Sequence, residues 1–345
     1  MPKELSSSKV FQALIAMAAV VVVVAGMRSS QAVLVPFVLS AFFAIMMAPA
    51  VFWLERKKLP TILAITLIIV VVIISGLLFG ALVGRSLSNF YSALPDIQIR
   101  LRGQTNQLIA WLHKHDIDVP KVQVMEFFDP AVAVRFAATT FSELGSVLGN
   151  AFFIILTAIF MLLEASSFPK KLRLAFKNPE KSLKSFDRFI HGVKQYMAIK
   201  TFTSLMTGLL IGVWLWIIGH DYYMLWATLA FALNYVPNIG SIIAAVPAVL
   251  VALIQNGVSG AAATVIGYVM VNVIIGNLLE PRMMGRGLGL STLVVFLSLV
   301  FWGWLWGPVG MLLSVPLTMI VKIAFESSDD TRWLSVLLDS EYIEA

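Results

Sequence analysis

The chain has 345 residues, of which 59% are hydrophobic and 13% are charged, and its mean hydropathy is +0.89. Soluble domains carry about 25% charged residues, so this composition excludes an ordinary soluble domain and predicts an integral membrane protein. The formal net charge of +6 comes largely from short loops, so it indicates membrane topology rather than nucleic-acid binding. The absence of cysteine excludes disulfides, thiol catalysis and cysteine metal sites.

Three apolar runs open the chain: Val10–Met27, Val33–Trp53 and Thr61–Gly84. About 20 apolar residues at helical rise cross the hydrocarbon core of a bilayer, so each run predicts a membrane span. Their continuous apolar character, without alternation, excludes a β-barrel. The first run exceeds the 7–15 apolar residues of a signal peptide, so we expect an uncleaved span. Residues 1–84 therefore form a predicted N-terminal transmembrane region.

Residues 85–146 predict a small helical insertion outside the membrane. Apolar residues recur there at spacings of three and four, which favours an amphipathic helix that Pro95 kinks near its start. Asp129 and Pro130 then mark a second helix start. That helix leads into a span over Val147–Leu163, within a predicted unit of residues 147–165. We expect the insertion to serve packing or oligomerisation, with a gate or filter as the alternative.

Residues 166–200 form a predicted basic cytoplasmic segment, with nine Lys or Arg residues against Glu180 and Asp187. Pro179 begins an expected amphipathic helix that lies on the anionic inner leaflet. With Lys3 and Lys9 near the start of the chain, this distribution places both termini in the cytoplasm. Residues 326–345 then form an acidic cytoplasmic tail.

Residues 201–325 contain a predicted inverted repeat, with units at residues 201–255 and 258–325. Each unit has one span, Thr201–Gly219 or Gly260–Leu279, followed by an apolar stretch that proline and glycine interrupt. The interruptions contain Pro237, Gly240 and Pro247 in the first unit and Pro308, Gly310 and Pro316 in the second. The two spans run in opposite directions, and inverted repeats with interrupted helices are typical of transporter binding sites.

The repeat core completes the predicted fold class, an all-α polytopic membrane protein. Its two units each consist of a span plus a Pro/Gly-broken hairpin, and the small helical insertion lies outside the cytoplasm. The half-helices around each break are short for complete spans, which favours re-entrant hairpins. Two Pro-kinked spans without a ligand remain the alternative.

Polar residues near the breaks form the candidate site. They are Asn234 and Asn238 beside the first break, Asn272 and Asn277 on the second unit's span, and Glu280, Arg282 and Arg286 in a glycine-rich segment expected to bend. Asparagine offers a donor and an acceptor, and arginine offers a planar fork of donors. The set suits a small hydroxylated or anionic solute. The structural alternative is a Glu280–Arg282 or Glu280–Arg286 ion pair that fixes the bend.

No catalytic constellation accompanies these residues. His113 and His115 do not share a helix face, and no nucleotide-binding motif indicates coupling to ATP. We therefore expect no enzyme activity, no cofactor and no metal, which leaves secondary transport or a passive pathway. The expected partners are a small polar solute and the lipid bilayer, without nucleic acid.

The motifs around the breaks resemble those of the autoinducer-2 exporter family of bacterial inner-membrane proteins. The resemblance covers essentially the whole chain and is strongest over residues 234–241, residues 279–286 and residues 302–316. It implies export of the furanone-like quorum signal autoinducer-2 by a homo-oligomer, with a pentamer and an elevator-like movement expected.

Other members of that family resemble sodium/proton antiporters, so an antiporter using Glu280 remains the alternative function. A membrane scaffold without transport is a third hypothesis. An antiporter favours several acidic residues deep in its spans, whereas Glu164 and Glu280 lie at span ends. The acidic pattern therefore favours the exporter.

Overall fold

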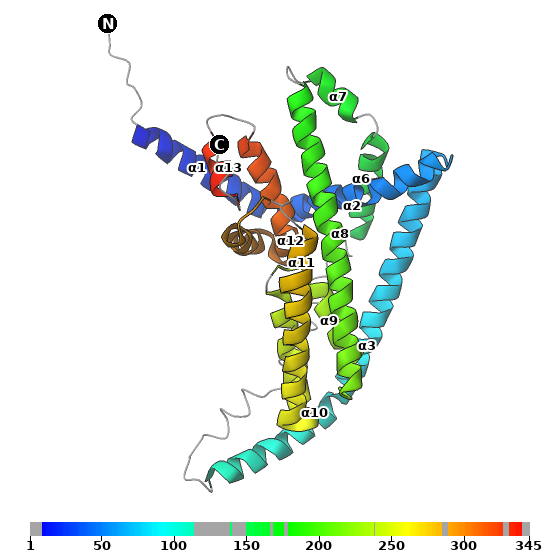
Figure 1. The fold of residues 1–345 in the computed structure, drawn as a ribbon, viewed down its shortest axis with the longest axis vertical. Coiled ribbons are helices and arrows are strands. Elements are labelled where there is room, and N and C mark those ends of the chain that lie inside the picture. Colours follow the sequence, from blue (N-terminus) through cyan, green and yellow to red (C-terminus); the bar gives the residue numbers. More distant parts are fainter. Residues whose placement is uncertain are drawn as a thin grey trace.

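The structure is a computed structural model that describes residues 9–113, 139, 150–165, 168–175, 179–237, 239–284, 289–326 and 331–339. Every regular element over these residues is a helix, which confirms the all-α fold class. Five described helical stretches are long and apolar enough to cross a membrane: Gln31–Arg56, Thr61–Ala93, Phe186–Ile217, Gly240–Met284 and Thr292–Glu326. The chain is therefore a multi-pass membrane protein (Figure 1).

The N-terminal helices form a layer around α2. Helix α1 covers Lys9–Ser29, α2 covers Gln31–Arg56, α3 covers Thr61–His113 and α6 covers Ala151–Ala165. Helix α2 packs against both α3 and α6. Their shared core contains Ala44, Ala48, Val51, Ala64, Ile65, Ala158 and Leu162. Alanine supplies four of these seven buried residues, and such small residues let apolar helices approach closely in a membrane.

Helix α3 is longer than the span expected from the sequence. The predicted span and the start of the predicted insertion form one helix of 53 residues that includes Pro95. Figure 1 shows this helix changing direction in its teal part, at the far end. Nearly all the remaining predicted insertion lies outside the described residues.

Helix α8 joins two elements that the sequence predicted as separate. It runs for 39 residues from Pro179 to Ile217, after the short helix α7 at Phe168–Ala175. The sequence predicted a boundary at Lys200, but the helix continues through this residue. The amphipathic segment is the first part of α8 rather than a separate helix on the leaflet. No proline lies between Pro179 and the end of α8 at Ile217, so the apolar face continues directly into the span.

The first predicted hairpin consists of α9 and the first part of α10. Helix α9 covers Tyr223–Leu233, a short break follows, and α10 covers Gly240–Val271. Gly257 has non-helical angles inside α10, with φ of 68° and ψ of −163°. It separates the second half of the hairpin from the next span.

That span ends in a wider helix instead of the predicted bend. The π-helix η1 covers Asn272–Leu279, and α11 continues over Glu280–Met284. The expectation that the segment bends from Glu280 onward is wrong for these five residues, which are helical. Gly289, with φ of +55°, follows later in the same segment and adopts the left-handed conformation that glycine favours.

The second predicted hairpin lies within α12, which covers Thr292–Glu326. Trp306 and Gly307 have non-helical angles and divide α12 into two halves. The short helix α13 follows at Arg332–Leu337. Helix α12 contacts α1, α2, α8 and α13, whereas α9 packs against α8, α10 and α3. The two hairpins therefore share α8 as a common neighbour.

The two breaks use glycine in the same way. A Cβ added to Gly240 would lie 1.8 Å from the carbonyl oxygen of Leu233, and one added to Gly310 would lie 1.9 Å from that of Trp302. In each hairpin, the start of the second half thus presses against a carbonyl of the first half. The repeat seen in the sequence is matched by the same close backbone contact in both hairpins.

Candidate functional site

The first break is bound to one face of α8. The Asn234 side chain donates from Nδ2 to Ser204 Oγ at 3.1 Å, and its backbone carbonyl accepts from Lys200 Nζ at 3.3 Å. Tyr235 donates its hydroxyl to Thr201 Oγ1 at 3.0 Å. Irregular backbone at membrane depth must find such partners within the protein. Helix α8 therefore supplies the polar groups that the broken hairpin needs.

A buried ion pair lies next to this break. Lys200 Nζ is 2.6 Å from Glu280 Oε1, and the two side chains are 4% and 14% exposed. Thr203 donates from Oγ1 to the other carboxylate oxygen at 3.4 Å. Removing two charges from water is expensive, and charged groups within membrane helices are functional candidates by default. The pair joins α8 to α11, two elements far apart in the sequence.

Lys200 belongs to a longer buried polar stripe on α8. The stripe consists of Tyr196, Lys200, Thr203, Ser204 and Thr207. Spacings of three and four place these side chains on one helix face over about 16 Å of axial rise. Among the described residues, the Tyr196 hydroxyl and Thr207 Oγ1 have no hydrogen-bond partner. The stripe thus offers hydroxyl groups, both bonded and unbonded, along one side of the first hairpin.

Helix η1 ties the next span to the same hairpin. Ser241, near the start of α10, donates from Oγ to Asn272 Oδ1 at 2.8 Å. π-Helical turns are rare and frequently occur at functional sites. Here η1 begins at Asn272, which contacts the hairpin, and leads into Glu280, which contacts α8. This short segment therefore positions two of the predicted site residues.

The structure divides the predicted site residues into three groups. Asn234, Asn272 and Glu280 make the contacts given above. Asn277 and Arg282 carry exposed side chains on η1 and α11. The two remaining candidates, Asn238 and Arg286, lie outside the described residues. Among the described residues the ion-pair partner of Glu280 is Lys200, which the sequence analysis did not name. The alternative pairing with Arg282 or Arg286 stays a prediction.

The second break meets the first at a small cavity of about 250 Å³. Tyr235 of the first break and Pro308 and Val309 beside the second all line it. The other lining residues come from α2, α8 and α12: Leu39, Phe42, Phe43, Met46, Met197, Leu312 and Leu313. The two breaks therefore share one cavity, as the inverted repeat led us to expect. Among the described residues that line the cavity, Tyr235 alone carries a hydroxyl.

Sequence reasoning missed Lys200 and the hydroxyl groups beside it. Lys200 was counted among the basic loop residues because it lies at the edge of an apolar run. The signal was nevertheless present, since Thr203, Ser204 and Thr207 follow Lys200 at helical spacing within an otherwise apolar span. A repeated polar face inside a predicted span is a useful sign of a buried polar contact.

Comparison with known proteins gives one consistent result. Residues 13–329 match the model of the AI-2E family transporter. The AI-2 transport protein TqsA of Escherichia coli K12 is 39% identical over 318 residues, which cover 92% of each chain. A putative transport protein of Haemophilus influenzae is 39% identical over 331 residues, with 94% and 95% coverage. The putative transport protein YhhT of E. coli K12 is 38% identical over 325 residues, with 94% and 93% coverage. With a family match along nearly its whole length and a multi-pass helical fold, the chain belongs to the AI-2E family of transporters.

Proposed function

We propose that the protein is a secondary transporter that exports a small hydroxylated solute, with autoinducer-2 as the first candidate. The observation that supports this most is the buried polar stripe of α8 beside the broken backbone of the first hairpin. The name of the E. coli relative, an AI-2 transport protein, supports the choice of solute. Elevator-like movement of the repeat region is part of the proposal.

The stripe has the chemistry that a hydroxylated solute requires. Each Ser or Thr hydroxyl donates one hydrogen bond and accepts others, and Asn234 offers an amide. A polar solute that leaves water must replace its hydrogen bonds, because an unpaired polar group in an apolar medium costs several kcal/mol. We propose that Asn234, Asn272 and Glu280 contribute to this exchange. Asn238, Asn277, Arg282 and Arg286 remain proposed members of the site.

Sodium/proton antiport is the alternative function, and Glu280 is the residue that favours it. A cation site needs several oxygen ligands that are free to coordinate, and among described residues the Glu280 carboxylate is paired with Lys200. The Lys200 ammonium, 2.6 Å from the carboxylate, already occupies the position that a coordinated cation would take. The geometry therefore favours the exporter over the antiporter.

A flux measurement separates the two functions. Liposomes that contain the purified protein are loaded with autoinducer-2 or with radioactive sodium. The movement of each compound across the membrane is then compared with its movement in protein-free liposomes. The exporter predicts protein-dependent movement of autoinducer-2 and no sodium/proton exchange. Sodium/proton exchange without autoinducer-2 movement would establish the alternative. Lys171→Met, which removes an exposed charge from α7, serves as a control with unchanged flux.

We also propose a cytoplasmic location for both termini, in a bacterial inner membrane. The test uses single cysteines, since the natural chain has none. A membrane-impermeant thiol reagent added to intact cells should label a cysteine at His113 and leave one at Lys181 unlabelled. The reverse pattern would invert the topology. Light scattering of the detergent-solubilised protein tests the proposed homo-oligomer, for which a pentamer is expected.

A further inference from the structure

Lys200 connects three separate elements through one ammonium group. The lysine lies on α8, its carboxylate partner begins α11, and its carbonyl partner follows α9. Both partners present oxygen atoms that accept hydrogen bonds from the ammonium. A solute rich in hydroxyl or carbonyl oxygens presents the same kind of atom. It therefore competes for the donors that now hold the hairpin and the span together.

We propose that Lys200 is the selectivity residue of the pathway, which binds acceptor oxygens of the solute and excludes cations. This proposal rests on the proposed function and deepens it by naming the ligand chemistry. Glu280 neutralises the ammonium, so neutral polyols are accepted without a surplus of charge. Tyr196 and Thr207, which lie on the same helix face, provide further hydroxyls for such a ligand.

The test replaces the ion pair by apolar residues of similar size, in the double variant Lys200→Met/Glu280→Leu. Apolar replacement of a buried ion pair is often neutral or stabilising, so we expect the unfolding midpoint in detergent to hold or rise. Flux of autoinducer-2 should fall about tenfold or more, the effect of losing a charge-assisted hydrogen bond. The single variant Lys200→Arg, which retains Glu280, should show more flux than the double variant, because it keeps charged donors at this position.

A matched control removes an exposed pair instead, in Lys171→Met/Glu164→Gln. That variant should keep the flux of the natural protein. Natural flux in a folded Lys200→Met/Glu280→Leu variant would overturn the role of Lys200 while leaving the exporter intact. Failure of the natural protein to move autoinducer-2 would overturn the proposed function. Sodium transport by the natural protein would overturn the role of Lys200 as well.

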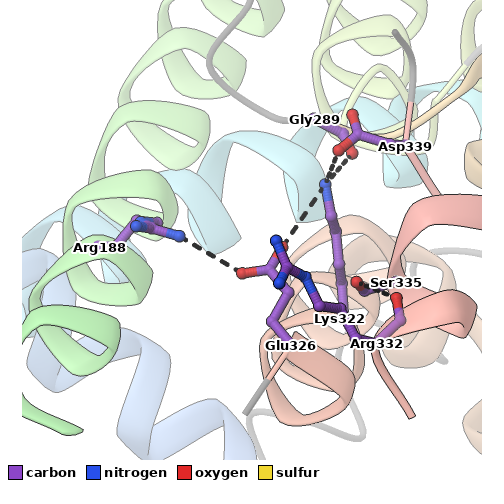
Figure 2. Close-up of polar contacts among 7 residues, drawn as sticks. All are labelled: Arg188, Gly289, Lys322, Glu326, Arg332, Ser335 and Asp339. Carbon is purple, nitrogen blue, oxygen red and sulfur yellow. Dashed lines mark hydrogen bonds and ion pairs between the residues drawn. The ribbon is translucent and has the colours of Figure 1, made fainter. Parts of the chain in front are cut away.

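A second buried lysine supports an independent inference (Figure 2). Lys322, near the end of α12, donates from Nζ to the Gly289 carbonyl at 2.5 Å and lies 2.8 Å from Asp339 Oδ2. Glu326 Oε1 lies 4.0 Å from the same ammonium, and its other oxygen is 3.3 Å from Arg188 of α8. One ammonium thus has two carboxylates within reach.

The backbone of the C-terminal segment contacts the same region. The Ser291 amide donates to the Leu338 carbonyl at 3.1 Å, and Leu338 packs against the core cluster that includes Leu290. Residues 289–291 lie between the second unit's span and the second hairpin, directly before α12. The segment from Thr331 to Asp339 therefore covers the connection through which the second hairpin is attached.

We infer that residues 331–339 form a releasable latch on this connection. Glu326 lies one helical turn from Lys322. When Asp339 moves away, Glu326 therefore pairs with the Lys322 ammonium, and the ammonium is not left without a carboxylate partner. Asp339 and Glu326 are 24% and 34% exposed, so salt screens their attraction to the lysine. In both arrangements of the latch, the Lys322 ammonium is paired with a carboxylate, either that of Asp339 or that of Glu326. Two alternative arrangements of this kind are what a switch requires.

The latch is tested by the reactivity of a cysteine at Leu338, which is independent of any transported solute. Asp339→Asn should speed thiol labelling of Leu338→Cys severalfold, and high salt should do the same in the protein that retains Asp339. A cysteine at the exposed Val336 should label at one rate in all conditions. Equal labelling of Leu338→Cys with and without Asp339, and at low and high salt, would overturn the latch.

Discussion

The two hairpins share a backbone design but differ in the partners of their polar groups. The first break binds the polar face of α8 through Asn234 and Tyr235. At the second, Trp302 donates its indole N–H to Thr318 of the same helix at 3.1 Å, and Trp306 donates to the Met27 carbonyl of α1 at 3.3 Å. One hairpin thus faces a polar stripe, and the other is held by large aromatic residues.

This difference separates the shape of the repeat from its chemistry. The same glycine contact closes both hairpins, so the backbone fold does not require the polar cluster. Among the bonds that the described residues show, the hydroxyls of Ser298 and Ser314 in the second hairpin donate only to carbonyls three residues away in their own helix. We therefore expect the first hairpin to handle the solute and the second to serve as an anchor.

The largest expected effect comes from removing one buried lysine at a time. Lys200→Met leaves Glu280 buried without its partner, which costs about 3–5 kcal/mol of unfolding free energy. Lys322→Met should cost less, about 1–3 kcal/mol, since its carboxylates are partly exposed. Unfolding midpoints in detergent measure both. Equal losses would contradict the view that only the first site is sealed from solvent.

The next effect tests the feature that both hairpins share. Gly240→Ala and Gly310→Ala each place a methyl group against a backbone carbonyl, so each should destabilise by about 3 kcal/mol. The yield of folded protein and its unfolding midpoint report the loss. Gly80→Ala is the control, because nothing lies within 4 Å of its added Cβ. If Gly310→Ala left the stability unchanged while Gly240→Ala lowered it, the repeat would be only approximate.

A smaller pair of changes separates chemistry from anchoring. Asn234→Ala removes the amide that bonds Ser204, and Trp302→Phe removes the indole donor to Thr318. Each lost buried hydrogen bond should cost about 1–3 kcal/mol. Flux should fall clearly in Asn234→Ala and stay near the natural value in Trp302→Phe once both are compared per folded protein. A stronger flux defect in Trp302→Phe would reverse the assignment of the two hairpins.

Tyr235→Phe should have the smallest effect. It removes the hydroxyl that donates to Thr201 but keeps the ring at the shared cavity, so it should cost about 0.5–1.5 kcal/mol. The unfolding midpoint should shift slightly, and the flux of autoinducer-2 should drop less than in Asn234→Ala. A complete loss of flux would place the solute at the cavity between the breaks instead of along α8.

The sequence predicted the elements better than the contacts between them. Apolar runs located the long helices, and the pairs Pro237/Gly240 and Pro308/Gly310 located both breaks, because these are local consequences of hydrophobicity and backbone geometry. Pro247 and Pro316, which were also predicted as break residues, lie within α10 and α12. The lengths of α3 and α8 were missed, because a helix that leaves the membrane continues wherever its polar residues also favour helix.

The candidate site was predicted only in part. Asn234, Asn272 and Glu280 stand out in the sequence as polar residues beside breaks or span ends. The partner of Glu280 did not, since Lys200 is distant along the chain and resembles a loop lysine at the edge of an apolar run. The number of residues per turn in η1 was equally invisible, because a π-helix differs from an α-helix in hydrogen bonding rather than in composition.

The number of residues per turn in η1 determines how well the chain tolerates changes in length at this segment. Asn272 meets Ser241 on the hairpin, and Glu280 meets Lys200 on α8. In an uninterrupted α-helix, residues eight apart point about 80° away from each other around the axis. The wider turns of η1 alter this angle and so set the angular register between the two contacts. An insertion or deletion of one residue within η1 would therefore misalign one contact relative to the other, although every interacting side chain would still be present.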